Sequence, residues 1–259
     1  MTDILSIDTN PKTVKGQKHG YMTAIVYLSP YKSSGQNICA MAELAECWFP
    51  CLNISGHGAI ASDEFNPHGI PLPDNAIQRA RLWRTNLYNY DRPKYMEMVV
   101  YEIERFIRKA ERKGLVPVIR LNGTSDIPFE RGHPCRRNGT DYNSIFEAFP
   151  DVQLYDYTKR ANRFNRTLPA NYHLSLSYSG ASDRYKLICM AAKQTHNCNL
   201  VVVVRNNKIK ESAIANGGID GDSHDLRFLD KPGAIVYLKA KGRAIHDKSG
   251  FVLDSPLSY

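Results

Sequence analysis

The chain lacks the features that mark several common protein classes. No apolar run approaches the roughly 20 residues that a membrane-spanning helix needs. Residues 1–10 contain neither the basic region nor the apolar core of a secretory signal. There is no P-loop, no dinucleotide-binding glycine motif, no G-x-S-x-G and no H-E-x-x-H. These absences predict a cytoplasmic protein with no membrane span, and they exclude the common nucleotide, serine-hydrolase and zinc-protease motifs.

Cysteine is scarce and unevenly placed. Six cysteines in 259 residues are too few and too scattered for the disulfide framework of a secreted protein. Three of them, Cys39, Cys47 and Cys51, nevertheless lie in one short segment. In a reducing compartment, such a cluster is more typical of metal binding than of disulfide formation. Cys189 lies in an apolar helical pattern, which predicts a buried structural thiol.

Positive charge exceeds negative charge, but without one long basic tract. The formal net charge is +8, and the sequence pI is near 9.1. Short basic groups occur at residues 105–112, 131–137 and 160–166. A mildly basic soluble enzyme has this composition, and so does a protein that contacts a nucleic acid or nucleotide. Both interpretations stay open.

Apolar strand-like runs alternate with helical patterns along the chain. The runs cover residues 21–28, 115–121, 152–155, 172–177 and 200–204. Such alternation predicts an α/β protein whose mostly parallel sheet is covered on both faces. Closing the units gives a full or partial (βα) barrel, which we favour over an open doubly wound sheet. No linker divides the chain, so residues 1–259 are expected to form one domain, with a turn-rich surface loop at 60–75.

The clearest helix follows that turn-rich segment and a first helix over residues 75–90. Asp91 is placed to cap it and Pro93 suits its first turn. An apolar stripe with three- and four-residue spacing then continues to Ala110, and Gly114 ends the pattern. The sequence therefore predicts a long amphipathic helix between Asp91 and Gly114.

Polar residues follow several of the predicted strands. In α/β proteins, ligands bind where the carboxyl ends of the strands meet the following loops. We therefore expect one set of side chains to line a cofactor and substrate rim there: Asn122, Ser125, Asp126, Lys159 and Ser177. Plainer roles are also open, because turns and helix caps use the same residue types and Asp156 could form a solvated ion pair with Lys159.

The three cysteines follow the first of these strands. Three thiolates on one loop can hold three irons of a [4Fe–4S] cluster, and the fourth iron is then open to S-adenosylmethionine. The alternative is a zinc site, with His57 or His68 as a fourth ligand. The third alternative is a set of thiols that binds no metal.

A second polar group occurs at residues 219–225, where Asp220, Asp222, Asp225 and His224 lie close together. Oxygen ligands of this kind suit a hard cation. The same composition is typical of a turn, and the glycine-bearing calcium loop of an EF-hand is absent. We favour the turn.

Several motifs resemble the phage gene product 88 family. They span most of the chain: residues 5–13 (LSIDTNPKT), 34–39 (SGQNIC), 47–53 (CWFPCLN), 120–126 (RLNGTSD), 155–159 (YDYTK), 171–176 (NYHLSL) and 219–222 (IDGD). The resemblance implies a virus-encoded protein that acts in the cytoplasm of a bacterial host.

A more distant resemblance is to the gene product 37/68-like phage proteins, which look like radical S-adenosylmethionine barrels. Only the three cysteines and the pair Thr158–Lys159 have counterparts. The chain departs from that pattern at Ala40, where proline is common, and at Glu46, where glycine is common. The resemblance implies a radical S-adenosylmethionine enzyme, and because the chain is basic and resembles phage proteins we expect it to act on a nucleotide or nucleic-acid base. The alternative is a zinc-stabilised nucleic-acid-binding or host-interaction protein without catalysis.

Overall fold

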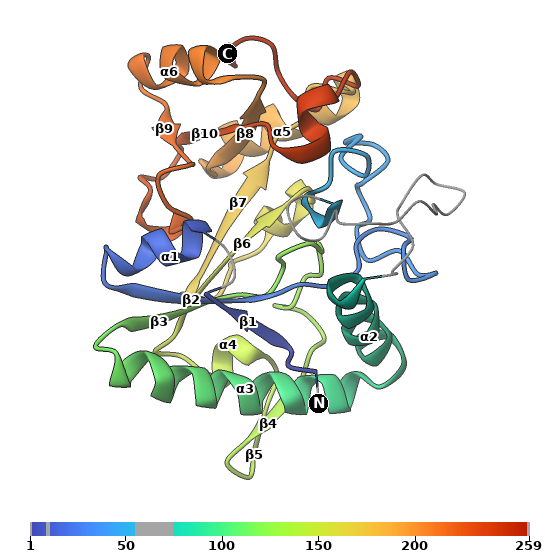
Figure 1. Ribbon diagram of the computed structural model, residues 1–259, viewed down its shortest axis with the longest axis vertical. Helices are drawn as coiled ribbons and strands as arrows, with labels where there is room; N and C mark the ends of the chain where they lie inside the picture. Colours follow the sequence, from blue (N-terminus) through green and yellow to red (C-terminus); the bar gives the residue numbers. More distant parts are fainter. Residues whose placement is uncertain (1, 9–10, 55–74, 258–259) are drawn as a thin grey trace.

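The computed structural model describes residues 2–8, 11–54 and 75–257. Within them the chain forms an eight-stranded sheet in the order β1-β2-β3-β6-β7-β8-β10-β9, and β4 and β5 form a separate hairpin (Figure 1). The mixed α/β class and the mostly parallel sheet are confirmed, because only β1 runs antiparallel to its neighbour. The predicted surface loop at 60–75 lies almost entirely outside the described residues.

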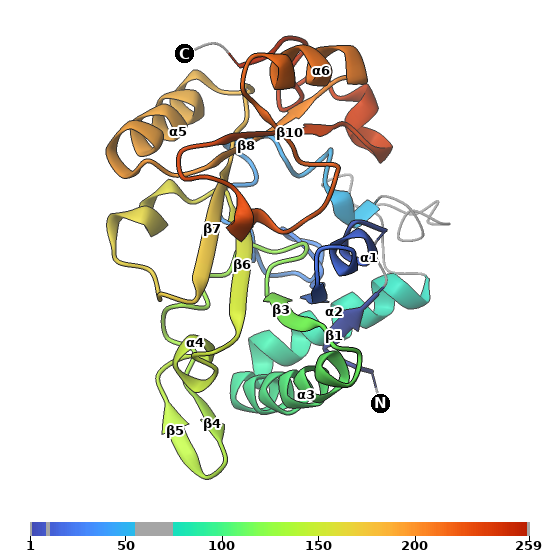
Figure 2. The same ribbon diagram turned by 90° about the vertical axis from the view of Figure 1, so that its left-hand side faces the viewer.

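Five strands of the large sheet fall close to the five predicted apolar runs. The strands of the large sheet are β1 Leu5–Ile7, β2 Tyr21–Val26, β3 Val116–Arg120, β6 Gln153–Thr158, β7 Tyr172–Ser177, β8 Leu200–Val204, β9 Ile219–Asp220 and β10 Ile235–Lys239. The hairpin strands are β4 Cys135–Arg137 and β5 Thr140–Tyr142. Figure 2 shows this hairpin projecting beyond α3 and α4.

The helices connect the strands. They are α1 Pro11–Gln17, α2 Ala76–Tyr90, α3 Arg92–Arg112, α4 Ile145–Ala148, α5 Asp183–His196 and α6 Asn207–Ala215, with 3₁₀ segments η1 Leu52–Ile54, η3 Ala161–Asn165, η4 Arg227–Leu229 and η5 Gly242–His246. Among the described helices, none is both long enough and apolar enough to cross a membrane.

The strand order bears on whether the sheet forms a barrel or an open doubly wound sheet. From β2 to β10 the central strands pair in the order in which they follow one another in the chain, apart from the intervening hairpin and β9. A doubly wound sheet reverses this order at a central switch point, whereas the described strands depart from it only at the edge, where β9 lies beyond β10. The end strands β1 and β9 do not pair with each other in the described part of the chain, so closure into a barrel is not seen there.

The long helix predicted from the apolar stripe is α3. The Asp91 carboxylate caps it by accepting a hydrogen bond from the Lys94 backbone N–H at 3.1 Å. Its buried face, including Ile103 and Phe106, joins the apolar cluster that also contains Ile119 of β3 and Leu154 of β6. A second apolar cluster joins α5 to β7, β8 and β10. Cys189 lies in it at 0% exposure, as predicted, and Cys135 and Cys198 are also buried.

The opposite face of the sheet is polar. Side chains alternate across a strand, so that Leu154 faces α3 whereas Tyr155 and Tyr157 face the other way. Both tyrosine hydroxyls donate to the Asp225 carboxylate, at 3.0 and 2.8 Å, and Arg120 of β3 donates to it at 3.1 Å. This buried network joins the middle of the sheet to the segment before η4.

Candidate functional site

The three clustered cysteines line one small cavity. Cys39, Cys47 and Cys51 lie on the loop that follows β2 (residues 27–54, the cysteine loop), and the cavity between them measures about 40 Å³. Its other lining residues are Pro30, Tyr31, Ala42, Trp48 and Asn53. In the described part of the chain, no three His, Cys, Asp or Glu side chains are arranged so that they could hold a metal ion. The thiols thus share a cavity without forming a preformed coordination site.

The cysteine loop is built from turns. Ala42 N–H donates to the Cys39 carbonyl at 3.0 Å, and Cys47 N–H donates to the Ala42 carbonyl at 3.1 Å. Glu46, directly before Cys47, has φ of +49°, the left-handed region that favours glycine. This is the position where the chain departs from the glycine of the distant resemblance. The Glu46 carboxylate instead accepts a hydrogen bond from the Trp48 indole at 3.0 Å.

The loop after β3 supports the cysteine loop directly. The Thr124 hydroxyl donates to the Leu28 carbonyl at 2.5 Å, and Asp126 N–H donates to the Ile38 carbonyl at 3.2 Å. Gly123 N–H donates to the Val26 carbonyl at 2.9 Å. A Cβ at Gly123 would lie 2.7 Å from that same oxygen, so only glycine permits this approach. Residues 122–126 (the buttress loop) therefore support the loop that carries the thiols.

Helix α2 supports the other end of the loop. The Asn53 carbonyl accepts hydrogen bonds from Gln78 at 2.9 Å and from Arg81 at 2.8 Å. The Asn53 backbone N–H in turn lies 3.5 Å from the Cys51 sulfur, which accepts it as a hydrogen bond. Backbone N–H donors of this kind stabilise a thiolate or a metal-bound sulfur.

All three thiols are shifted toward their protonated forms. Burial raises the pKa of Cys39, Cys47 and Cys51, and that of Cys47 reaches about 11. The positive charge of Lys159 acts against burial at Cys47 by lowering its pKa. At neutral pH these thiols are protonated, so they are poor nucleophiles, and each must lose a proton to bind a metal.

Asn122 and Ser125, both predicted on the rim, lie inside a hydrogen-bond network. The Asn122 side-chain oxygen accepts from the Ser125 hydroxyl at 2.8 Å. The backbone N–H and side-chain amide of Asn122 donate to the Asp156 carboxylate at 2.7 and 3.0 Å, and the Tyr172 hydroxyl also donates to it at 3.0 Å. Burial raises the pKa of Asp156 to about 6. The prediction that Asp156 begins a loop is wrong, because β6 continues to Thr158 and Asp156 points into the interior.

Asp126 joins three segments of the chain. Its carboxylate accepts hydrogen bonds from the Thr158 hydroxyl at 2.7 Å, the Lys159 backbone N–H at 2.9 Å and the Arg163 guanidinium at 3.2 Å. Arg163 is itself fully buried. Asp126 therefore fixes the end of β6 against the buttress loop.

Lys159 brings a cation to the same region. Its ammonium donates to the backbone carbonyls of Ser177 at 3.0 Å and Tyr178 at 3.1 Å, and it lies 4.5 Å from the Phe251 ring centre. Burial lowers the pKa of Lys159 below its usual value, although the nearby Cys47 acts to raise it. The structure thus brings together Lys159, the end of β7 at Ser177 and the thiol of Cys47. It contradicts the plain alternative of an ion pair between Lys159 and Asp156, because these side chains bind other partners.

The polar group at residues 219–225 forms the predicted turn. The Asp222 carboxylate lies 2.9 Å from Lys12, 3.0 Å from Lys241 and 3.3 Å from Lys210. Burial alone would raise its pKa, but the hydrogen bond and charge of Lys12, together with hydrogen bonds from the Lys239 backbone and the Lys241 side chain, hold the pKa well below its usual range. The carboxylate that a cation would need is therefore already neutralised by lysines from α1, α6 and the segment after β10.

Sequence reasoning missed the residues that complete these networks. Arg163 and Glu130 form a buried bidentate pair, and Arg120 pairs with Asp225. The one available signal was the spacing of Tyr155 and Tyr157, which lie two positions apart in β6 and therefore on one face of the strand. Charged partners more than 30 positions apart carry no local spacing signal.

Comparison with known proteins bears on the whole chain. The family model described as gene product 88 matches residues 4–255. No curated protein and no solved structure matches the chain.

Proposed function

We propose that this chain, which belongs to the gene product 88 family, binds a [4Fe–4S] cluster and uses S-adenosylmethionine for radical chemistry. The observation that carries the proposal is the shared cavity of Cys39, Cys47 and Cys51 beyond the C-terminal end of β2. In α/β proteins this edge of the sheet is where reactive sites lie. Three thiolates leave one iron of the cluster without a protein ligand, and a small-molecule cofactor can occupy that position.

The donor set fits such a cluster, whereas the cavity needs to widen. No fourth cysteine lines it. Its volume of about 40 Å³ is room for only two or three water molecules. Cluster binding would therefore require the cysteine loop to move, because its hydrogen-bonded turns hold the three thiols around this small cavity.

Each neighbouring group has a distinct role in the proposal. Lys159 supplies positive charge next to the Cys47 thiolate. Trp48 and Tyr31, whose rings stack 6.4 Å apart, exclude water and oxidant. Asn122, Ser125 and Asp126 would hold the rim in position through their hydrogen bonds, and Lys159, which binds the Ser177 carbonyl, would contact the cofactor together with Ser177. When bound, the cluster and S-adenosylmethionine, with one electron from an external reductant, supply a carbon radical that removes hydrogen from the substrate.

The substrate we propose is a nucleotide or nucleic-acid base, and the setting is the cytoplasm of a bacterial host. The net charge of +8 supports an anionic substrate. The sequential strand order supports a partial (βα) barrel, whose polar face carries Arg120, Tyr155 and Tyr157.

The test is anaerobic reconstitution with iron and sulfide, followed by dithionite and S-adenosylmethionine. We expect uptake of about four irons per chain and release of methionine. A variant with alanine at Cys39, Cys47 and Cys51 should lose both, whereas the matched control Cys135→Ala should keep both because Cys135 does not line the cavity. Failure of the parent protein to take up a cluster rejects the proposal.

The second candidate is a zinc-stabilised nucleic-acid-binding protein without catalysis. The small cavity favours it, because a single ion needs less space than a four-iron cluster. Its fourth ligand would be His57 or His68, and both lie outside the described residues. It predicts one tightly held zinc per chain and nucleic-acid affinity that falls linearly with salt on logarithmic axes. A protein whose fold and partner binding survive loss of all three thiols would instead be a metal-free interaction protein.

A further inference from the structure

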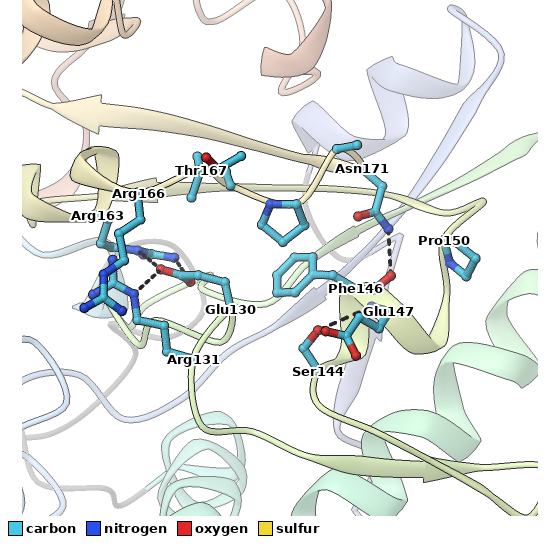
Figure 3. A pocket seen from close by; sticks show the side chains of 13 residues that line it. Glu130, Arg131, Ser144, Phe146, Glu147, Pro150, Arg163, Arg166, Thr167 and Asn171 are labelled. Atoms are coloured by element: carbon cyan, nitrogen blue, oxygen red, sulfur yellow. Dashed lines mark hydrogen bonds and ion pairs between the residues drawn. The ribbon is translucent and has the colours of Figure 1, made fainter.

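A second and larger cavity lies away from the cysteines. It measures about 550 Å³ and shares no lining residue with the thiol cavity. Its walls come from residues 130–131, 144–150 and 163–171 (Figure 3). In the described chain the crossover from β6 to β7 contains the 3₁₀ segment η3 but no α-helix. The cavity volume of about 550 Å³ is within the range of sites that bind small organic ligands.

Three arginines meet at one end of this cavity. Arg131 belongs to one basic group of the sequence, and Arg163 and Arg166 belong to another. Figure 3 shows their side chains gathered around Glu130. Folding thus concentrates in one place a positive charge that is diffuse in the sequence.

Two of these arginines have most of their N–H donors unused. The Arg163 guanidinium, in contrast, makes a bidentate pair with Glu130, at 3.0 and 2.7 Å, and further bonds to Asp126 and to the Tyr172 hydroxyl. The Glu130 charge is therefore already neutralised. Arg131 lies 3.9 Å from Glu130, beyond hydrogen-bond distance. Arg166 is exposed and has no hydrogen bond or ion pair to any described residue.

The rest of the cavity suits the body of a ligand. Phe146, Leu168 and Pro169 give it apolar walls. At the far end the Glu147 carboxylate accepts hydrogen bonds from the Asn143 backbone and side chain, both at 3.1 Å. The cavity is therefore positive at one end, apolar in the middle and negative at the other.

We infer that this cavity binds a phosphate-bearing ligand of nucleotide size, with its phosphate on Arg131 and Arg166 and its body along Phe146 and Leu168. One guanidinium group can donate two parallel hydrogen bonds to a phosphate. Two neighbouring guanidinium groups with free N–H donors therefore suit a phosphate group. The Glu147 end suits hydrogen-bond donors such as the amino groups of a base. This inference does not depend on the metal proposal.

The test is calorimetric titration of the full chain with each of the four common ribonucleoside 5′-monophosphates and with the four matching nucleosides. We expect at least one monophosphate to bind and its nucleoside to bind much more weakly. The double variant Arg131→Gln/Arg166→Gln should weaken binding about tenfold or more, because it removes charged hydrogen bonds. The matched control Arg184→Gln changes an exposed arginine of α5 outside the cavity and should leave binding intact.

Three results would overturn the inference: no monophosphate binds, the nucleoside binds equally well, or the double variant binds like its parent. A parallel titration with a single-stranded oligonucleotide distinguishes the source of the phosphate. If only the oligonucleotide binds, the arginines belong to a nucleic-acid surface and not to a nucleotide site. The Cys39/Cys47/Cys51 alanine variant should bind the monophosphate normally, so that failure of the metal proposal is recognised separately.

Discussion

Replacing Asp126 by alanine probes the junction that holds the buttress loop against β6. The change removes the acceptor for Thr158, for Lys159 N–H and for one N–H of Arg163. A buried hydrogen bond contributes about 0.5–1.5 kcal/mol when neutral and about 1.5–3 kcal/mol when charged. Arg163 keeps its bidentate bond to Glu130, so its charge stays compensated. We therefore expect the free energy of unfolding to fall by about 3 kcal/mol, which is less than the summed contributions of the three hydrogen bonds.

Thermal and urea unfolding followed by circular dichroism measure this loss. In a chain of this size, about 3 kcal/mol corresponds to a fall in Tm of about 6–12 °C. Asp126→Asn keeps part of the acceptor set and should lose less. The control Asp183→Ala removes an exposed carboxylate and should cost less than about 0.5 kcal/mol. If Asp126→Ala costs no more than this control, the junction does not stabilise the fold and our reasoning about it is wrong.

Three further predictions concern the cysteine loop and the loop after β3 that supports it. Gly123→Ala should cost about 1–3 kcal/mol, because its Cβ would meet backbone, whereas Gly16→Ala makes ordinary side-chain contact and should be neutral or stabilising in the same unfolding assay. Glu46→Gly should be tolerated and Glu46→Val should cost about 1–2 kcal/mol, since φ is positive there; equal Tm values for the two would contradict this. Because burial raises the pKa of the thiols, to about 11 at Cys47, zinc or cobalt affinity in competition titrations should fall as pH is lowered from 8 to 6, by up to about tenfold per pH unit for each thiol. A pH-independent affinity would show that the thiols are not the ligands.

The fold was largely accessible from the sequence because its elements carry local signals. The stripe of α3, its Asp91 cap and the β-branched run of β8 are patterns that a short window contains. The short antiparallel strand β1 and the β4–β5 hairpin were missed, since three residues give too little periodicity. Whether the sheet closes into a barrel could not be predicted from the sequence, because closure depends on pairing between strands far apart in the chain.

The candidate site was predictable in its location but not in its roles. The rule that ligands lie at the carboxyl ends of parallel strands brought the cysteine loop and residues 122–126 to one edge. A turn or cap role for that second segment was one of two alternatives open from the sequence, and its support of the cysteine loop became evident only from the contacts of Gly123 and Thr124. The buried pair of Arg163 and Glu130 was not visible, because charge pairing across 33 positions leaves no trace in local spacing.

Metal analysis tests most directly whether the three thiols hold a cluster. The metal content and visible absorption spectrum of the anaerobically purified protein are measured in parallel with those of the Cys39/Cys47/Cys51 alanine variant. We predict about four irons per chain and the broad visible absorption of an iron–sulfur cluster, both absent from the variant. One zinc per colourless chain, or iron retained by the variant, would contradict the proposal that these three thiols hold a [4Fe–4S] cluster.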